Sequence, residues 1–200
     1  GRLGNGASAE DTFTSAVRAD VDNVVQVDAM TAQGAVLSAT GVVTYWPKKP
    51  TSYKYGIKEQ SSFTSGCTPS EVSAGGYSAA ESFWCAIVEC SGDRDDYVQC
   101  WGDNDVYKLG DGTATDSWST PVTVAGLPGG NYTSLSCGTH SSCVVVDGEA
   151  VWCWGDNTYY GARGDGTSAG RTVPVEVQGL SEGSVATVEA GYKAGCASVG

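Results

Sequence analysis

The residues of this chain that could do chemistry are one histidine, eight cysteines and several aspartates beside glycine or asparagine. His140 could act as a general base, but no second histidine and no nucleophile sequence accompanies it, so we interpret it as a structural hydrogen-bonding residue. The aspartates at 103, 111, 156 and 165 lack the spacing of a calcium-binding loop. Aspartate side chains bond backbone amides in turns, which explains them better. We therefore expect no catalytic site, no metal site and no cofactor.

The eight cysteines favour disulfide bonds over metal binding. The sequence has no CxxC pair that suggests zinc, and a single histidine leaves little to complete a Cys/His site. Cys143 and Cys153 each lie five residues from Gly148, in two strand-like runs that flank the hairpin signal Asp147-Gly148. We expect these two cysteines to face each other within disulfide reach.

The composition predicts an all-β protein. Short β-branched runs alternate with the 28 glycines and with aspartate, while helix formers are sparse. Six tryptophans and ten tyrosines need burial, which argues against disorder. No apolar run approaches the ~18 residues of a membrane span. The net charge of −12 argues against a nucleic-acid-binding surface, which needs a basic stripe.

The chain repeats itself at a spacing of 53 residues. The phrase CWGDN at 100–104 returns at 153–157, and PVTV at 121–124 returns as PVEV at 174–177. A weaker copy extends back to Trp46, so we expect a fragment of a longer array. We divide it into a partial first repeat (1–45), an irregular second (46–100), a third (101–153) and a truncated fourth (154–200). The second repeat is expected to be short of a strand between Pro69 and Gly75.

A tryptophan at a fixed phase of the repeat is expected to fill the same pocket in every unit. The structural core of the repeat is then Trp46, Trp101, Trp154, Gly102 and Gly155. A single unit cannot bury both of its faces, so neighbouring units must stack and share a core.

These phrases resemble the regulator of chromosome condensation repeat, closely over 100–200 and more loosely before that. The resemblance implies a β-propeller, usually with seven blades. This chain would then be a partial propeller of four-stranded antiparallel blades, and the remaining blades of its own propeller would cover its ends.

The resemblance also bears on the other cysteines. The stretch CAIV at 85–88 is similar to the family's CAL strand, which pairs Cys85 with Cys100. Spacing alone would pair Cys90 with Cys100, because their separation of ten residues matches that of the first predicted pair. Cys67, Cys90 and Cys137 then remain without a derived pairing, and Cys196 is expected to pair with a cysteine beyond residue 200.

Stretches that depart from the repeat are where we expect a protein partner to bind, because insertions in a propeller map to its loops. Tolerated drift in loop sequence is the alternative explanation. The candidate binding residues are Lys48, Lys49, Tyr53, Tyr55, Trp84, Asp93, Arg94, Asp95, Asp96 and Tyr97.

The sequence thus predicts a non-enzymatic module that binds a protein of unknown identity, with no nucleic acid. The cysteines, and a glycosylation sequon at Asn131, favour the extracellular space or the secretory lumen, with the cytoplasm as the alternative. The resemblance implies two other functions, namely guanine-nucleotide exchange on a small GTPase and inhibition of an enzyme.

Overall fold

The structure is a computed structural model that describes residues 22–30, 33–46, 58–60, 63–78, 80–158, 164–180, 184–192 and 194–199. In these ranges the regular elements are β-strands. The first sheet contains β1 (Val24–Met30), β2 (Gln33–Ser38), β3 (Val43–Tyr45) and β4 (Lys58–Gln60). The second contains β5 (Cys67–Gly75), β6 (Phe83–Cys90), β7 (Tyr97–Gly102) and β8 (Ser117–Thr123).

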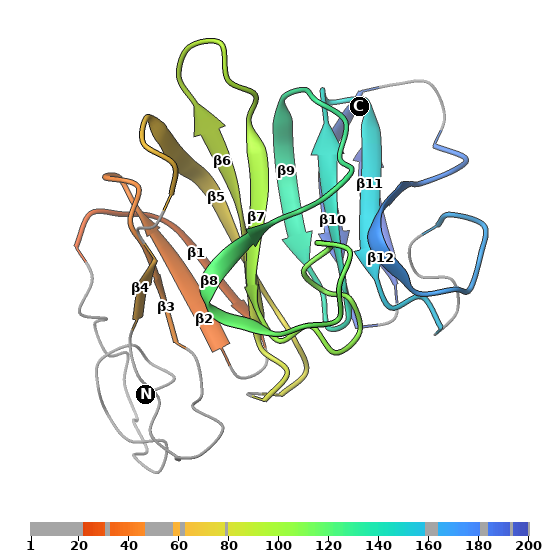
Figure 1. The fold of residues 1–200 in the computed structure, drawn as a ribbon. Helices are drawn as coiled ribbons and strands as arrows, with labels where there is room; N and C mark the ends of the chain where they lie inside the picture. Colours follow the sequence, from red (N-terminus) through yellow and green to blue (C-terminus); the bar gives the residue numbers. More distant parts are fainter. Residues whose placement is uncertain are drawn as a thin grey trace, which may run out of the picture.

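The third sheet contains β9 (Tyr132–Cys137), β10 (Ser141–Val146), β11 (Ala150–Gly155) and β12 (Arg171–Glu176). A two-stranded sheet of β13 (Val185–Ala190) and β14 (Gly195–Val199) follows. Every pairing joins strands that are consecutive in the chain and antiparallel. Figure 1 shows the sheets side by side in chain order, from orange through green to blue.

The sheets and the sequence repeats are out of phase. Trp101 and Trp154 lie in β7 and β11, the third strands of their sheets, and Trp46 directly follows β3. A unit that starts at tryptophan therefore joins the fourth strand of one sheet to the first three of the next. The expectation that a strand is lacking between Pro69 and Gly75 is wrong, because β5 runs through this stretch. A register shift between Pro69 and Glu71 interrupts its alternation, which hides the strand in the sequence.

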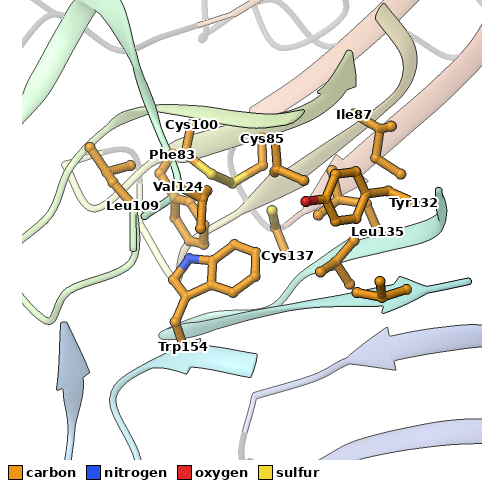
Figure 2. Packing of buried hydrophobic residues seen from close by; sticks show 13 residues of the cluster. Phe83, Cys85, Ile87, Cys100, Leu109, Val124, Tyr132, Leu135, Cys137 and Trp154 are labelled. Carbon is orange, nitrogen blue, oxygen red and sulfur yellow. A yellow bond between two sulfur atoms is a disulfide. The ribbon is translucent and has the colours of Figure 1, made fainter. Parts of the chain in front are cut away.

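Each third-strand tryptophan packs against the preceding sheet. Trp101 lies with Trp84 against Tyr45 of the first sheet, with ring centroids 5.6 and 4.7 Å from that of Tyr45. Trp154 is fully buried against the second sheet. Figure 2 shows its indole beside the disulfide of Cys85 and Cys100, with Phe83, Leu109 and Val124 around it. The repeat thus builds the core between sheets rather than within one sheet.

Three disulfides reinforce the sheets and join Cys67 to Cys90, Cys85 to Cys100, and Cys143 to Cys153. The hairpin turn predicted at Asp147-Gly148 is present, with positive φ at both residues. Each crosslink closes a short loop and stabilises the fold by about 2.5–3.5 kcal/mol. The bond between Cys67 and Cys90 has no counterpart among the predicted pairs.

Two cysteines remain free among the described residues. Cys196 is exposed in β14, whereas Cys137 is buried between the second and third sheets. Burial raises the pKa of the Cys137 thiol to about 12. Because the thiolate is the nucleophilic form, Cys137 is unreactive while the chain is folded.

Glycine is required where neighbouring sheets touch. A Cβ at Gly75 would lie 2.4 Å from the Phe83 ring and 2.5 Å from the carbonyl oxygen of Gly138 in the next sheet. A Cβ at Gly138 would in turn lie 2.5 Å from the carbonyl oxygen of Gly191. The backbones also bond here, since Gly76 N–H donates to Gly138 O at 3.0 Å. Any side chain at these positions would push the sheets apart.

We therefore expect Gly75→Ala to lower the free energy of unfolding, measured by urea denaturation, by about 1–3 kcal/mol, because the added methyl group overpacks the interface. Gly129→Ala is the matched control, since a Cβ there has no atom within 4 Å. The control should change stability by less than about 1 kcal/mol. Equal effects of the two substitutions would contradict the close approach of the sheets.

Candidate interaction surface

The first strand of each sheet carries polar side chains that bond the next sheet. Gln26 Oε1 accepts a hydrogen bond from the N–H of Val72 at 2.7 Å. Glu71 Oε1 accepts one from Leu135 N–H at 3.2 Å, and Ser134 Oγ accepts one from Val188 N–H at 3.2 Å. The same contact is therefore made at three successive interfaces, although the residue types differ.

A second row of contacts runs parallel to the first, two residues further along. Asp28 Oδ2 accepts from Ala74 N–H at 2.8 Å, and Ser73 Oγ accepts from Cys137 N–H at 3.0 Å. Ser136 Oγ accepts from Ala190 N–H at 2.9 Å. We call these two rows the inner ladder. Its rungs satisfy buried backbone donors and fix how each sheet is placed against the next.

The inner ladder lines a polar cavity of about 260 Å³. Asp28, Glu71 and Glu189 give this cavity a negative charge. Burial raises the pKa of Glu71, the charges of Asp28 and Glu189 raise it further, and the hydrogen bond from Leu135 N–H lowers it. Because these three side chains accept hydrogen bonds from the protein itself, we interpret the cavity as structural. Within the described residues, no group of three or more His, Cys, Asp or Glu could hold a metal ion.

Asn104 organises the loop that follows β7. It is fully buried, and its Nδ2 donates to the carbonyl oxygens of Thr113 and Thr115 at 3.1 and 3.2 Å. Its Oδ1 accepts from Leu109 N–H at 2.9 Å. Asn157 makes the equivalent contact one sheet later, to the carbonyl oxygen of Thr167 at 2.6 Å. The asparagine of the CWGDN phrase thus anchors a turn.

A lysine is buried in the same loop. The ammonium group of Lys108 contacts the carboxylates of Asp103 and Asp105, the latter at 3.0 Å, and lies 5.7 Å from the centroid of the Phe83 ring. Burial raises the pKa of Asp103 to about 6, against the opposing effect of Lys108. The carbonyl oxygen of Lys108 accepts from Trp154 Nε1 at 2.8 Å. The cluster therefore ties the loop to the tryptophan of the next sheet.

The end of the sheets where β6 turns into β7, and β10 into β11, presents four of the ten predicted binding residues. We call this end the hairpin rim, comprising residues 91–96, 128–131 and 147–149. Figure 1 shows that the turn between β6 and β7 extends beyond the neighbouring strands. Asp93, Arg94 and Asp95 are exposed there.

Other predicted binding residues have different places. The prediction that Trp84 belongs to the binding surface is wrong, because Trp84 lies opposite Trp101 in the β6–β7 pairing and is fully buried. Asp96 and Tyr97 support the turn, since Asp96 accepts from Cys90 N–H at 2.8 Å and the Tyr97 hydroxyl accepts from Thr64 N–H at 3.2 Å. Lys48, Lys49, Tyr53 and Tyr55 lie outside the described residues.

Carboxylates from two sheets gather on the hairpin rim. Burial raises the pKa of the Tyr132 hydroxyl, and the negative charges of Asp95, Asp96 and Asp147 raise it further. These three carboxylates therefore act on one phenol from two different hairpins. Glu149 is exposed beside Asp147. Sequence reasoning assigned Asp147 to turn formation alone, because only the folded sheets bring the two hairpins together.

At the opposite end of the sheets, two exposed tyrosines meet. Tyr77 and Tyr192 are 57% and 53% exposed, and their ring centroids are 5.7 Å apart. The ring of His140 lies 6.0 Å from that of Tyr192. The ring of His140 therefore extends the contact between the two tyrosines.

Comparison with known proteins agrees with this geometry. The profile of the Regulator of chromosome condensation (RCC1) repeat matches residues 95–145. The human E3 ubiquitin-protein ligase HERC2 is 30% identical over 176 residues, which are 84% of this chain and 3% of the ligase. The Arabidopsis thaliana mitochondrial RCC1 domain-containing protein RUG3 is 27% identical over 112 residues, 53% of this chain and 25% of that protein.

Solved structures share the fold. Human WBSCR16 superposes with a TM-score of 0.69 at 18% identity, covering 89% of this chain and 45% of that chain. Prp20p from Saccharomyces cerevisiae superposes with a TM-score of 0.66 at 14% identity, covering 89% of this chain and 44% of that chain. This chain thus spans less than half the length of each of these four proteins.

The stacked four-stranded sheets and their third-strand tryptophans define a partial β-propeller, so the predicted all-β fold is confirmed. The chain belongs to the regulator of chromosome condensation (RCC1) repeat family. Among the residues that the structure describes, we find no helix that could span a membrane.

We expect Asn104→Ala to lower the free energy of unfolding by about 2–3 kcal/mol, because it leaves the buried Leu109 N–H and two carbonyl oxygens of the loop without this partner. Asn131→Ala is the control, since the Asn131 side chain is exposed and should contribute within about 0.5 kcal/mol. Chemical denaturation followed by tryptophan fluorescence measures both. An effect of Asn104→Ala no larger than that of the control would show that the loop does not depend on this side chain.

Proposed function

We propose that the chain is a non-enzymatic protein-binding module and that the hairpin rim is its contact surface. The observation that carries the proposal is the exposure of Asp95 and Asp147 in the turns of two successive hairpins, whose negative charges both raise the pKa of Tyr132. Asp93 and Glu149 add two exposed carboxylates to the same end of the sheets.

The chemistry of this surface fits a partner with a basic segment. Clustered exposed carboxylates attract a positively charged surface over several ångströms and steer its approach. The net charge of −12 adds a long-range attraction of the same sign. The rim therefore supplies both the direction and the speed of encounter.

The turns of the rim are held in place before binding. The disulfide of Cys67 and Cys90 ties the end of β6, where the β6–β7 turn begins, to the start of β5. The Ser91 hydroxyl donates to the carbonyl oxygen of Gly66 at 3.0 Å, and Asp96 accepts from Cys90 N–H. A loop that is already ordered loses less conformational entropy when it binds.

We place the module in an oxidising compartment, either outside the cell or in the secretory lumen. The three disulfides support this placement, because thiols are kept reduced in the cytosol. Asn131 is exposed at the rim, where its sequon is accessible. Its glycosylation stays a prediction from the sequence.

Nucleotide exchange is the second candidate. The Prp20p structure was reported together with binding properties of Prp20p to Gsp1p and histones, and a further structure shows yeast RCC1 (Prp20) bound to Kap60. At 14% identity this likeness supports the fold and not the activity. Accelerated release of fluorescent GDP from a small GTPase, at catalytic amounts of the chain, would replace our proposal with an exchange factor.

The binding surface can be tested with a lysine- and arginine-rich peptide as the probe. We expect the double variant Asp93→Asn/Asp95→Asn to weaken binding about three- to tenfold, because each exposed charge contributes about 0.2–1 kcal/mol. Glu59→Gln/Glu176→Gln is the matched control, since both residues are exposed on outer strands and the change in net charge is the same. Titration followed by fluorescence anisotropy measures the affinities. Equal weakening by both variants would mean that net charge, not the rim, attracts the probe.

A further inference from the structure

An open pocket of about 390 Å³ lies between the first two sheets, where the β2–β3 turn meets the start of β5. Leu37 and Pro69 line it and are buried, whereas Thr40 and Ser70 line it and are exposed. Pockets that hold a ligand commonly have volumes of about 300–1,000 Å³. The pocket therefore has room for a side chain, with apolar groups in its interior and hydroxyl groups at its entrance.

The next interface between sheets has a tyrosine at the corresponding place. Pro69 lies opposite Val88 near the start of β5, and Tyr132 lies opposite Val146 at the start of β9. A register shift accompanies each of these two pairs. Two residues later, each strand carries a rung of the inner ladder. Pro69 and Tyr132 are therefore equivalent positions of two successive sheets.

Tyr132 shows what this position holds at the second interface. Its side chain is buried in the cluster that contains Ile87, and its hydroxyl donates to a backbone carbonyl oxygen at 2.8 Å. Figure 2 shows its ring beside Ile87. Leu37 is the counterpart of Ile87 in the first sheet, since each lies opposite the first ladder residue of its own sheet. The ring that fills the second interface is thus replaced at the first by the shorter Pro69, which leaves the pocket.

The pocket adjoins the hairpin rim. Thr68 lines the pocket and is two residues from Gly66, whose carbonyl oxygen accepts a hydrogen bond at 3.0 Å from the N–H of Ser91 in the rim. Two extended residues span about 7 Å. Glu89 lies opposite Thr68 and is exposed, so the carboxylates of the rim continue toward the pocket. A segment bound at the rim therefore reaches the pocket within a few residues.

We propose that this pocket takes a tyrosine side chain from the basic segment that the hairpin rim attracts. The inference rests on the proposed function and adds the residue that anchors the partner. The ring packs against Leu37 and Pro69, and its hydroxyl group stays among the hydroxyl groups at the entrance. Tyrosine suits such a place, because it buries a large apolar ring at a low cost in conformational entropy while its polar end stays wet.

Two labelled peptides test the pocket separately from the rim. One is Lys-Arg-Tyr-Arg-Lys, and the other has alanine in place of tyrosine, so their charges are equal. We expect the unmodified chain to bind the tyrosine peptide about tenfold more tightly, which corresponds to ~1.4 kcal/mol. Fluorescence anisotropy measures both affinities. In NMR spectra, the methyl signals of Leu37 should shift on addition of the tyrosine peptide and not of the alanine peptide.

The variant Pro69→Tyr should fill the pocket from within, as Tyr132 fills the next interface, and reduce the ratio between the two peptides to about one. Pro69→Ala is the matched control, because it restores the same backbone N–H without filling the pocket. The control should keep the preference for the tyrosine peptide. Circular dichroism shows whether each variant keeps its sheets, and if Pro69→Tyr does not, the ratio on the unmodified chain still decides.

Equal affinities of the unmodified chain for the two peptides would overturn the proposal. The proposed function would survive that result if Asp93→Asn/Asp95→Asn still weakened binding of both peptides. A tenfold ratio with no weakening by the double variant would instead support the pocket and contradict the rim. Contacts in the free chain between the Leu37 methyl groups and an aromatic ring from outside the described ranges would also overturn the proposal, because the chain would then fill the pocket itself.

Discussion

The contact between neighbouring sheets is the interaction on which the rest of this structure depends. A four-stranded antiparallel sheet whose faces are both apolar cannot bury them alone, so each sheet must supply the surface that its neighbour lacks. Trp154 makes this contact from the third strand, and the inner ladder makes it from the first strand. Gly75 and Gly138 let the backbones approach closely enough for both contacts to form. The repeated residues therefore determine how each sheet packs against the next.

Because strand residues make the contacts between sheets, the turns are available for binding. The buried Asn104 and the Lys108 cluster anchor the loop that follows β7. The hairpin rim of this chain is acidic, with Asp93, Asp95, Asp96, Asp147 and Glu149 against Arg94. The contacts between sheets also explain the pocket beside β5, where Pro69 takes the place that Tyr132 fills at the next interface.

Structural features that recur with the same residue types in each repeat could be predicted from the sequence. Features whose residue types differ between repeats were missed. The pairing across the Asp147-Gly148 turn followed from one hairpin signal, because a short turn fixes the register of its strands. The inner ladder was missed because equivalent rungs use different residue types, namely glutamine, glutamate and serine in one row and aspartate and serine in the other. Trp84 was misplaced because an aromatic residue near a divergent loop looks the same in sequence whether it is buried or exposed. In the structure its position opposite Trp101 places it in the buried part of the sheet.

Amide hydrogen exchange, resolved residue by residue by NMR, tests the coupling of the sheets most directly. The amides to follow are those that donate across interfaces: Val72, Ala74, Leu135, Cys137, Val188 and Ala190. We predict that they exchange as slowly as amides paired within a sheet, because the rungs open only when sheets separate. Exchange as fast as that of the exposed turns, while the within-sheet amides stay protected, would contradict this coupling.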